Sequence, residues 1–129
     1  METIHLDTHI AIWLFSGEWT SRLKRYKKTS ERSILQVSPI VEMEIQFLCE
    51  IGRLKFPGKV VVTELMERLG LKISASSFHQ VIRQSHFETW TRDPFDRIIV
   101  ANAKTDGARL LTKDENILAN FPQAFIELC

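Results

Sequence analysis

The sequence predicts an α/β fold, a three-layer α/β/α sandwich around a central, mainly parallel sheet, formed by a single domain over residues 1–129. Short apolar runs of strand length alternate with longer segments of helical periodicity along the chain. Turn and capping signals separate these segments, and no repeat or low-complexity stretch interrupts them. A length of 129 residues also suits one hydrophobic core, since compact domains commonly have about 100 to 150 residues.

Two helices carry the strongest local signals. Ser38-Pro39 opens a helix that Gly52 ends, because serine is a favoured N-cap and proline a favoured first helical residue. Asp93-Pro94 repeats this signal.

The predicted elements are, in chain order, a strand through Ile4 and Leu6 ending at Asp7, a helix Ile10–Phe15, a basic helix Trp19–Thr29, a strand near Ser33–Val37, a helix Pro39–Ile51, a helix Val60–Leu69 after a Pro57-Gly58 turn, a strand Leu71–Ser74, a helix Ser77–Phe87, a helix Pro94–Thr105, a strand Ala108–Thr112, a short helix Glu115–Asn120 and a last strand Ala124–Leu128.

The composition narrows the class of protein. Hydrophobic residues make up 44% and charged residues 26%, as in soluble globular proteins, and no apolar run approaches the roughly 18 residues of a membrane span. No secretory signal is recognisable at the start, so a cytoplasmic location is expected. Cys49 and Cys129 have no zinc-type spacing. The net charge of +1 does not indicate nucleic-acid binding by bulk charge, but neutralising four acids would raise it to about +5.

Two aspartates follow predicted strands directly. In open parallel sheets, ligands bind beyond the carboxyl ends of the strands, and Asp7 and Asp114 stand at such ends. Each also has a plain structural explanation, because aspartate is a favoured N-cap for the helix that comes next. Capping and a functional role both stay open for these two residues.

Two further acids lie on helices. Glu44 has only apolar neighbours three and four positions away, whereas Glu42 falls on the polar face, so Glu44 is predicted on the buried side. A buried carboxylate must be neutralised, paired with a basic side chain or bound to a cation. Asp96 lies in a first helical turn, where the helix dipole favours it, and Asp93 is the natural N-cap. Asp96 also shares a stripe with apolar residues, which predicts that it points toward packed structure.

The four acids together suggest a metal site. If Asp7, Glu44, Asp96 and Asp114 converge, their carboxylates repel one another unless divalent cations hold them. Oxygen-only ligands favour Mg²⁺ or Mn²⁺, which keep bound waters and stabilise in-line displacement at phosphate. Phosphodiester hydrolysis is the chemistry that such a site performs most naturally.

Several short motifs resemble the signatures of PIN-domain nucleases, and among them the small VapC-type toxins of toxin–antitoxin pairs. The resemblance covers nearly the whole chain. Its motifs are specific together and weak singly: Leu6-Asp7-Thr8, Asp93-Pro94-Phe95-Asp96-Arg97, Leu111-Thr112-Lys113-Asp114, and the pattern of Ser38, Glu44 and Gly52-Arg53-Leu54.

The resemblance implies a Mg²⁺- or Mn²⁺-dependent endoribonuclease that acts on RNA such as tRNA, forms a homodimer and has a VapB-type antitoxin. Asp7, Glu44, Asp96 and Asp114 match the family's metal-binding acids, and Thr8 and Thr112 match hydroxyls that orient the site. The alternatives are a DNA-directed nuclease of the same fold and a non-catalytic PIN-fold module that binds RNA or protein. A phosphate-receiving signalling domain fits poorly, because Asp7 has no adjacent acid.

The basic residues allow two interpretations. The stretch from Arg22 to Arg32 either steers RNA toward the acids or is a solvated helix face. Arg97, Arg109 and Lys113 flank the acids and would contact phosphates or form salt bridges. The four histidines show no paired metal spacing, so structural hydrogen bonds are expected for each.

Overall fold

The computed structural model describes residues 1–17 and 31–126. The predicted helix Trp19–Thr29 and most of the basic stretch from Arg22 to Arg32 lie outside the described residues, so both stay predictions. No helix in the described ranges combines the length and the apolar character needed to cross a bilayer.

A five-stranded sheet forms the centre of the molecule, with strand order β3-β2-β1-β4-β5. Every pairing between the described strands is parallel, which confirms the predicted α/β class. The chain leaves β1 toward β2 and β3, then returns past β1 to β4 and β5. Its strands are β1 (Glu2–Leu6), β2 (Ser33–Val37), β3 (Lys72–Ile73), β4 (Arg109–Leu111) and β5 (Ala124–Phe125).

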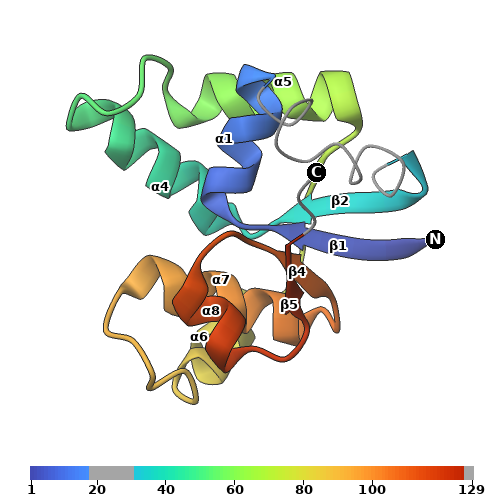
Figure 1. The fold of residues 1–129 in the computed structure, drawn as a ribbon, viewed down its shortest axis with the longest axis vertical. Helices are drawn as coiled ribbons and strands as arrows, with labels where there is room; N and C mark the ends of the chain where they lie inside the picture. The colour runs from blue at the N-terminus through green and yellow to red at the C-terminus, as the bar shows by residue number, and fades with distance from the viewer. Residues whose placement is uncertain (18–30, 127–129) are drawn as a thin grey trace.

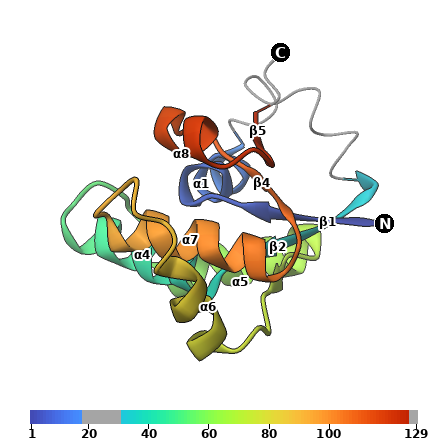
Figure 2. The same cartoon turned by 90° about the horizontal axis from the view of Figure 1, so that it is seen from below.

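Helices cover both faces of this sheet (Figure 1). Helices α1, α4 and α5 pack together over one face, and α6, α7 and α8 lie over the other. Figure 2 shows α6 and α7 side by side, in agreement with their contacts. The helices are α1 (Thr8–Ser16), α4 (Pro39–Glu50), α5 (Gly58–Leu69), α6 (Phe78–Ser85), α7 (Pro94–Thr105) and α8 (Glu115–Asn120).

The core explains why the strands read as apolar runs. Ile4, His5 and Leu6 of β1 are all buried, because helices cover both of its faces. His5 points to a polar network instead of apolar side chains: its Nε2 lies 2.7 Å from Asp106 Oδ2, so the structural role predicted for this histidine is confirmed.

Several element boundaries differ from the prediction. The strand expected over Leu71–Ser74 is only the two residues of β3, because β3 pairs with β2 over two residues alone. Helix α5 starts at Gly58, so the predicted Pro57-Gly58 turn is in fact the helix N-terminus, with Pro57 as N-cap. Strand β4 and helix α6 are also shorter than expected, and β5 ends at Phe125 within the described residues.

Candidate active site

The sheet has its topological switch point between β1 and β4. These neighbouring strands are followed by helices on opposite faces. Ligands of such sheets bind in the region beyond the carboxyl ends of these strands, which is called the crevice below. Asp7 follows β1 and Asp114 follows β4, so the two predicted strand-end acids stand at this crevice.

Asp7 is held in place through both carboxylate oxygens. The Thr8 backbone N–H donates to Oδ1 at 2.8 Å, so Asp7 caps α1, and the Thr112 hydroxyl donates to Oδ2 at 2.6 Å. Asp7 is only 4% exposed. Burial raises the pKa of Asp7 against the lowering effect of these hydrogen bonds, and Asp114 raises it further. Asp7 is therefore a helix N-cap, as one of its two interpretations predicts. Capping uses Oδ1 only and does not explain the hydrogen bond to Oδ2.

Thr112 joins the two strand-end acids. Its side chain is fully buried, donates to Asp7 and accepts a hydrogen bond from the Asp114 backbone N–H at 3.0 Å. Asp114 in turn caps α8, because its Oδ1 accepts from the Ile117 backbone N–H at 3.0 Å. The hydroxyl that was expected to orient the site thus contacts both acids.

Glu44 reaches the crevice from α4. It is half-buried and accepts a hydrogen bond from the Thr8 hydroxyl, whereas Glu42 is exposed, as the helical periodicity predicts. Among the described residues no basic side chain forms an ion pair with Glu44, so the salt-bridge alternative is not observed. Burial raises the pKa of Glu44, and Asp7, Asp93 and Asp114 add to the rise.

The apolar face of α4 is less buried than predicted. Phe47 is 46% exposed and lies beyond the sheet, where its ring centroid is 5.8 Å from that of Phe95 on α7. Helices α4 and α7 come from opposite faces of the sheet and meet at this contact. The pair therefore links α4 and α7, the two helices that carry Glu44 and Asp96.

Asp96 enters the crevice from the first turn of α7. Asp93 is the N-cap, and its Oδ1 accepts from the backbone N–H groups of Phe95 and Asp96 at 2.8 and 3.2 Å. The half-buried Asp96 side chain has no ion pair in the described part of the chain. Desolvation raises the pKa of Asp96 to about 7, with further contributions from Asp93, Asp7, Asp114 and Glu44.

The acids that follow β1 and β4 and those on α4 and α7 lie within electrostatic reach of one another. Each of Asp7, Glu44 and Asp96 has a pKa above its ordinary value, and each is raised by other acids of the group. Such a cluster is costly without a counter-charge, because like-charged carboxylates disfavour ionisation in one another. Asp93 joins it electrostatically, a contribution that its sequence signal as a helix cap did not reveal.

The donor set suits a hard divalent cation. All candidate ligands are carboxylate oxygens, with hydroxyls from Thr8 and Thr112 directly behind them. Within the described residues, no three acidic, histidine or cysteine side chains form a ready-made coordination shell. Mg²⁺ does not require one, since it commonly keeps several waters and binds through one or two carboxylates.

The basic residues that flank the acids in the sequence differ in the partners that they contact. Arg109 pairs with Glu2, with its Nε 2.6 Å from Oε2, which supports the salt-bridge interpretation. The Arg97 guanidinium donates to the Ser85 carbonyl at 3.0 Å. Lys113 instead lies over the ring of Trp13, 5.0 Å from its centroid, a contact that no local pattern in the sequence indicated.

A doubly wound parallel fold with acids at its switch point places this protein among the α/β proteins whose ligands bind beyond the carboxyl ends of the strands. Within that class, residues 4–122 match the PIN domain family, and the chain belongs to this family.

Relatives and solved structures agree with this assignment. The chain is 28% identical over 127 residues to Ribonuclease VapC22 of Mycobacterium tuberculosis, covering 91% of both proteins. Its fold is similar to a chain in the crystal structure of VapBC2 from Rickettsia felis bound to a promoter DNA fragment, with TM-score 0.67, 18% identity and 97% of both chains covered. A toxin–antitoxin complex from Klebsiella pneumoniae gives TM-score 0.64 at 23% identity, with 95% of both chains covered.

Proposed function

We propose that this protein is a Mg²⁺- or Mn²⁺-dependent endoribonuclease and the toxin of a type II toxin–antitoxin pair. The observation that carries the proposal is that Asp7, Glu44, Asp96 and Asp114 lie within electrostatic reach of one another at the switch point, with no ion pair to a lysine or arginine among the described residues. The similarity to a protein named as a ribonuclease supports RNA over DNA as the substrate.

The four acids would hold the metal, and two hydroxyls would keep them oriented. A bound Mg²⁺ or Mn²⁺ would supply a polarised water as nucleophile and offset negative charge on the scissile phosphate. The Thr112 hydroxyl fixes the rotamer of Asp7, and the Thr8 hydroxyl fixes Glu44, so two ligands are preorganised before substrate arrives. Asp96 on α7 and Asp114 after β4 would supply the other two carboxylates.

The raised pKa of Asp96 implies that a proton and a metal ion would compete for this carboxylate. With a pKa of about 7, the Asp96 carboxyl is about half protonated at neutral pH in the absence of metal. Binding a divalent cation displaces that proton, so metal affinity should increase with pH through this range.

The wider assignments follow from the same proposal. The protein would act as a single-domain enzyme in the cytoplasm, associate as a homodimer and be neutralised by a VapB-type antitoxin; solved complexes of similar fold are toxin–antitoxin assemblies. Structured RNA such as tRNA is the proposed target. Expression of the chain alone should arrest growth, and co-expression with the product of the neighbouring gene should relieve the arrest.

Incubation of the purified protein with total RNA and Mg²⁺ or Mn²⁺ tests the enzymatic proposal directly. We expect discrete fragments that disappear with EDTA and with the Asp96→Asn variant, which removes charge at nearly constant volume. A parallel reaction with single- and double-stranded DNA tests the alternative substrate. Failure to cleave any RNA, or equal cleavage by Asp96→Asn, would refute the proposal.

A further inference from the structure

We propose that Lys113, held against Trp13, binds a backbone phosphate of the RNA strand beside the scissile position. The inference rests on the proposed function, because it concerns the substrate of the same acid cluster. It assigns Lys113 as the substrate-contacting cation of the site and Trp13 as the residue that positions it.

The location of Lys113 places it at the rim of the crevice. It stands in the chain between Thr112, whose hydroxyl donates to Asp7, and Asp114, which is itself one of the four acids. The Lys113 side chain itself is exposed. Consecutive Cα atoms are about 3.8 Å apart, so the base of this side chain is one residue from two groups of the site.

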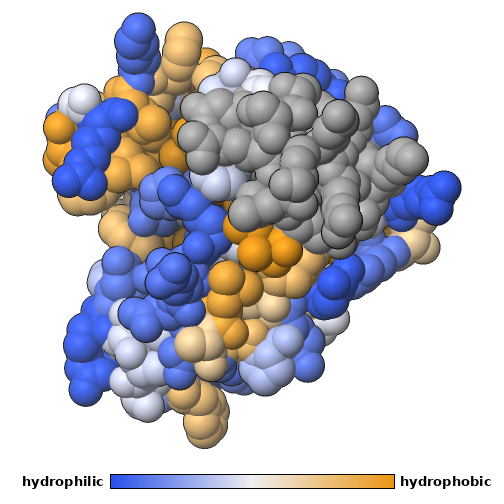
Figure 3. Space-filling view, viewed as in Figure 1, coloured by the Kyte–Doolittle hydropathy of each residue, from blue (hydrophilic) through white to orange (hydrophobic). Residues whose placement is uncertain are grey.

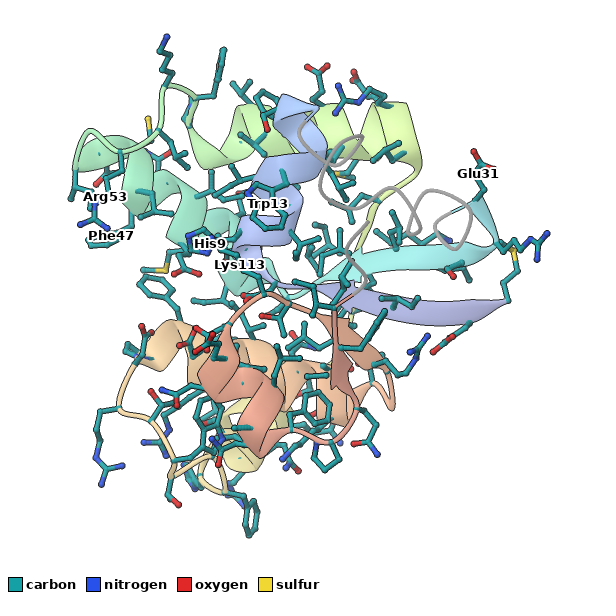
Figure 4. All side chains as sticks on the ribbon, viewed as in Figure 1. His9, Trp13, Glu31, Phe47, Arg53 and Lys113 are labelled. Carbon is teal, nitrogen blue, oxygen red and sulfur yellow. The ribbon has the colours of Figure 1, made fainter. Side chains whose placement is uncertain are left out.

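The aromatic ring that holds Lys113 comes from helix α1. His9 and Trp13 are four residues apart and so lie on the same side of the helix, one turn from each other. The Trp13 ring lies beneath the Lys113 ammonium group, and the exposed His9 is close enough to Asp7 to lower its pKa. Figure 4 shows His9, Trp13 and Lys113 together between the α1 half and the α7–α8 half of the molecule.

The two other basic residues that flank the acids in the sequence, Arg97 and Arg109, already have partners. Arg97 donates to the Ser85 carbonyl and Arg109 is paired with Glu2, whereas Lys113 has no carboxylate partner among the described residues. The aromatic ring orients the ammonium group without neutralising it, since a cation–π contact leaves the charge in place. Lys113 is therefore available to an anion.

The chemistry of the site requires such a cation. An RNA strand that approaches the crevice carries one negative charge per phosphate, and the acid cluster repels it beyond the phosphate that a metal would neutralise. In Figure 3 a patch of hydrophilic side chains lies between the two halves, with apolar side chains on either side of it, and further apolar side chains gather over α4 and its loop to α5. An RNA strand that follows these hydrophilic side chains passes Lys113.

Binding of a fluorescein-labelled single-stranded RNA tests this assignment. Anisotropy is measured with Mg²⁺ in the Asp96→Asn background, so that the RNA stays intact, over a range of KCl concentrations. We expect Lys113→Ala to weaken binding about five- to tenfold and to reduce the slope of log K against log [salt] by about 0.7, the value for one contact with a single strand. Lys113→Arg should restore the slope.

Two further variants separate the contact from its support and from general charge. Trp13→Leu should weaken binding about two- to fivefold with the slope nearly unchanged, and Trp13→Phe should weaken it less, because an aromatic ring remains. Lys59→Ala on α5 is the matched control: it removes the same charge from an exposed position and should leave both quantities unchanged. Equal effects of Lys59→Ala and Lys113→Ala would overturn the proposal.

Cleavage kinetics in the otherwise unaltered protein give an independent readout. Lys113→Ala should raise KM about five- to tenfold and leave kcat within about twofold. A loss confined to kcat would refute the binding role, while metal-dependent cleavage would still support the enzyme. Absence of cleavage by the unaltered protein would instead refute the proposed function, and the binding series would still decide whether Lys113 contacts RNA.

Discussion

Replacing Asp96 by asparagine should stabilise the metal-free protein, and the gain should depend on pH. The pKa of Asp96 is about 7 in the folded protein, against an ordinary value of 3.8, because burial and the surrounding acids disfavour its charge. Between these two values the unfolded chain is ionised while the folded chain retains the proton. Asp96 therefore lowers the free energy of unfolding progressively as pH rises from about 4 to about 7.

The size of the effect follows from the same pKa values. The difference between 3.8 and about 7 corresponds to about 4 kcal/mol, at about 1.4 kcal/mol per pKa unit. Since Asp96 is only half-buried, solvent screening reduces this, and we expect a gain of about 2 kcal/mol above pH 7. Below pH 4 the gain should be close to zero, because the carboxyl is then protonated in both states.

Urea unfolding with EDTA at pH 4, 6 and 8 measures this directly for both proteins. Excess Mn²⁺ at pH 8 should reverse the order, because the unaltered protein gains the binding free energy of the ion and Asp96→Asn gains less of it. A stability difference that does not change with pH would show that Asp96 is not in an acid cluster. The argument for a cation site at the switch point would then fail.

Two other changes probe the site, and a third probes the packing of α5 against α4. Thr112→Val should destabilise the fold by about 1 to 3 kcal/mol, measured by thermal unfolding, since buried Asp7 loses a hydrogen bond at nearly constant side-chain volume. Glu44→Gln should weaken Mn²⁺ binding at least tenfold in a titration, whereas Glu42→Gln should not; equal losses would refute the assignment of Glu44. Gly58→Ala should cost about 1 to 3 kcal/mol in urea unfolding, because a Cβ there would stand 2.2 Å from the Glu42 carbonyl oxygen; an unchanged midpoint would contradict this packing.

Local chemistry made much of the fold predictable. Ser38-Pro39 and Asp93-Pro94 mark the starts of α4 and α7, because an N-cap side chain satisfies backbone N–H groups only a few residues away. Apolar runs revealed the strands for a similar reason, since a parallel sheet buried on both faces needs nearly continuous hydrophobic residues. The lengths of the edge strands were not predictable, because they depend on how far a neighbour continues: β3 pairs with β2 over two residues only.

The sequence by itself determined which acids are candidates and where each stands in its own element: Asp7 and Asp114 after strands, Glu44 and Asp96 on helices. Tertiary structure decided that neighbouring acids raise the pKa values of Asp7, Glu44 and Asp96, that Thr112 hydrogen-bonds with both the Asp7 side chain and the Asp114 backbone, and that Lys113 lies over Trp13. Trp13 and Lys113 are a hundred positions apart in the chain. Capping and periodicity act over a few residues, whereas such contacts depend on how helices cross a sheet, which no local pattern encodes.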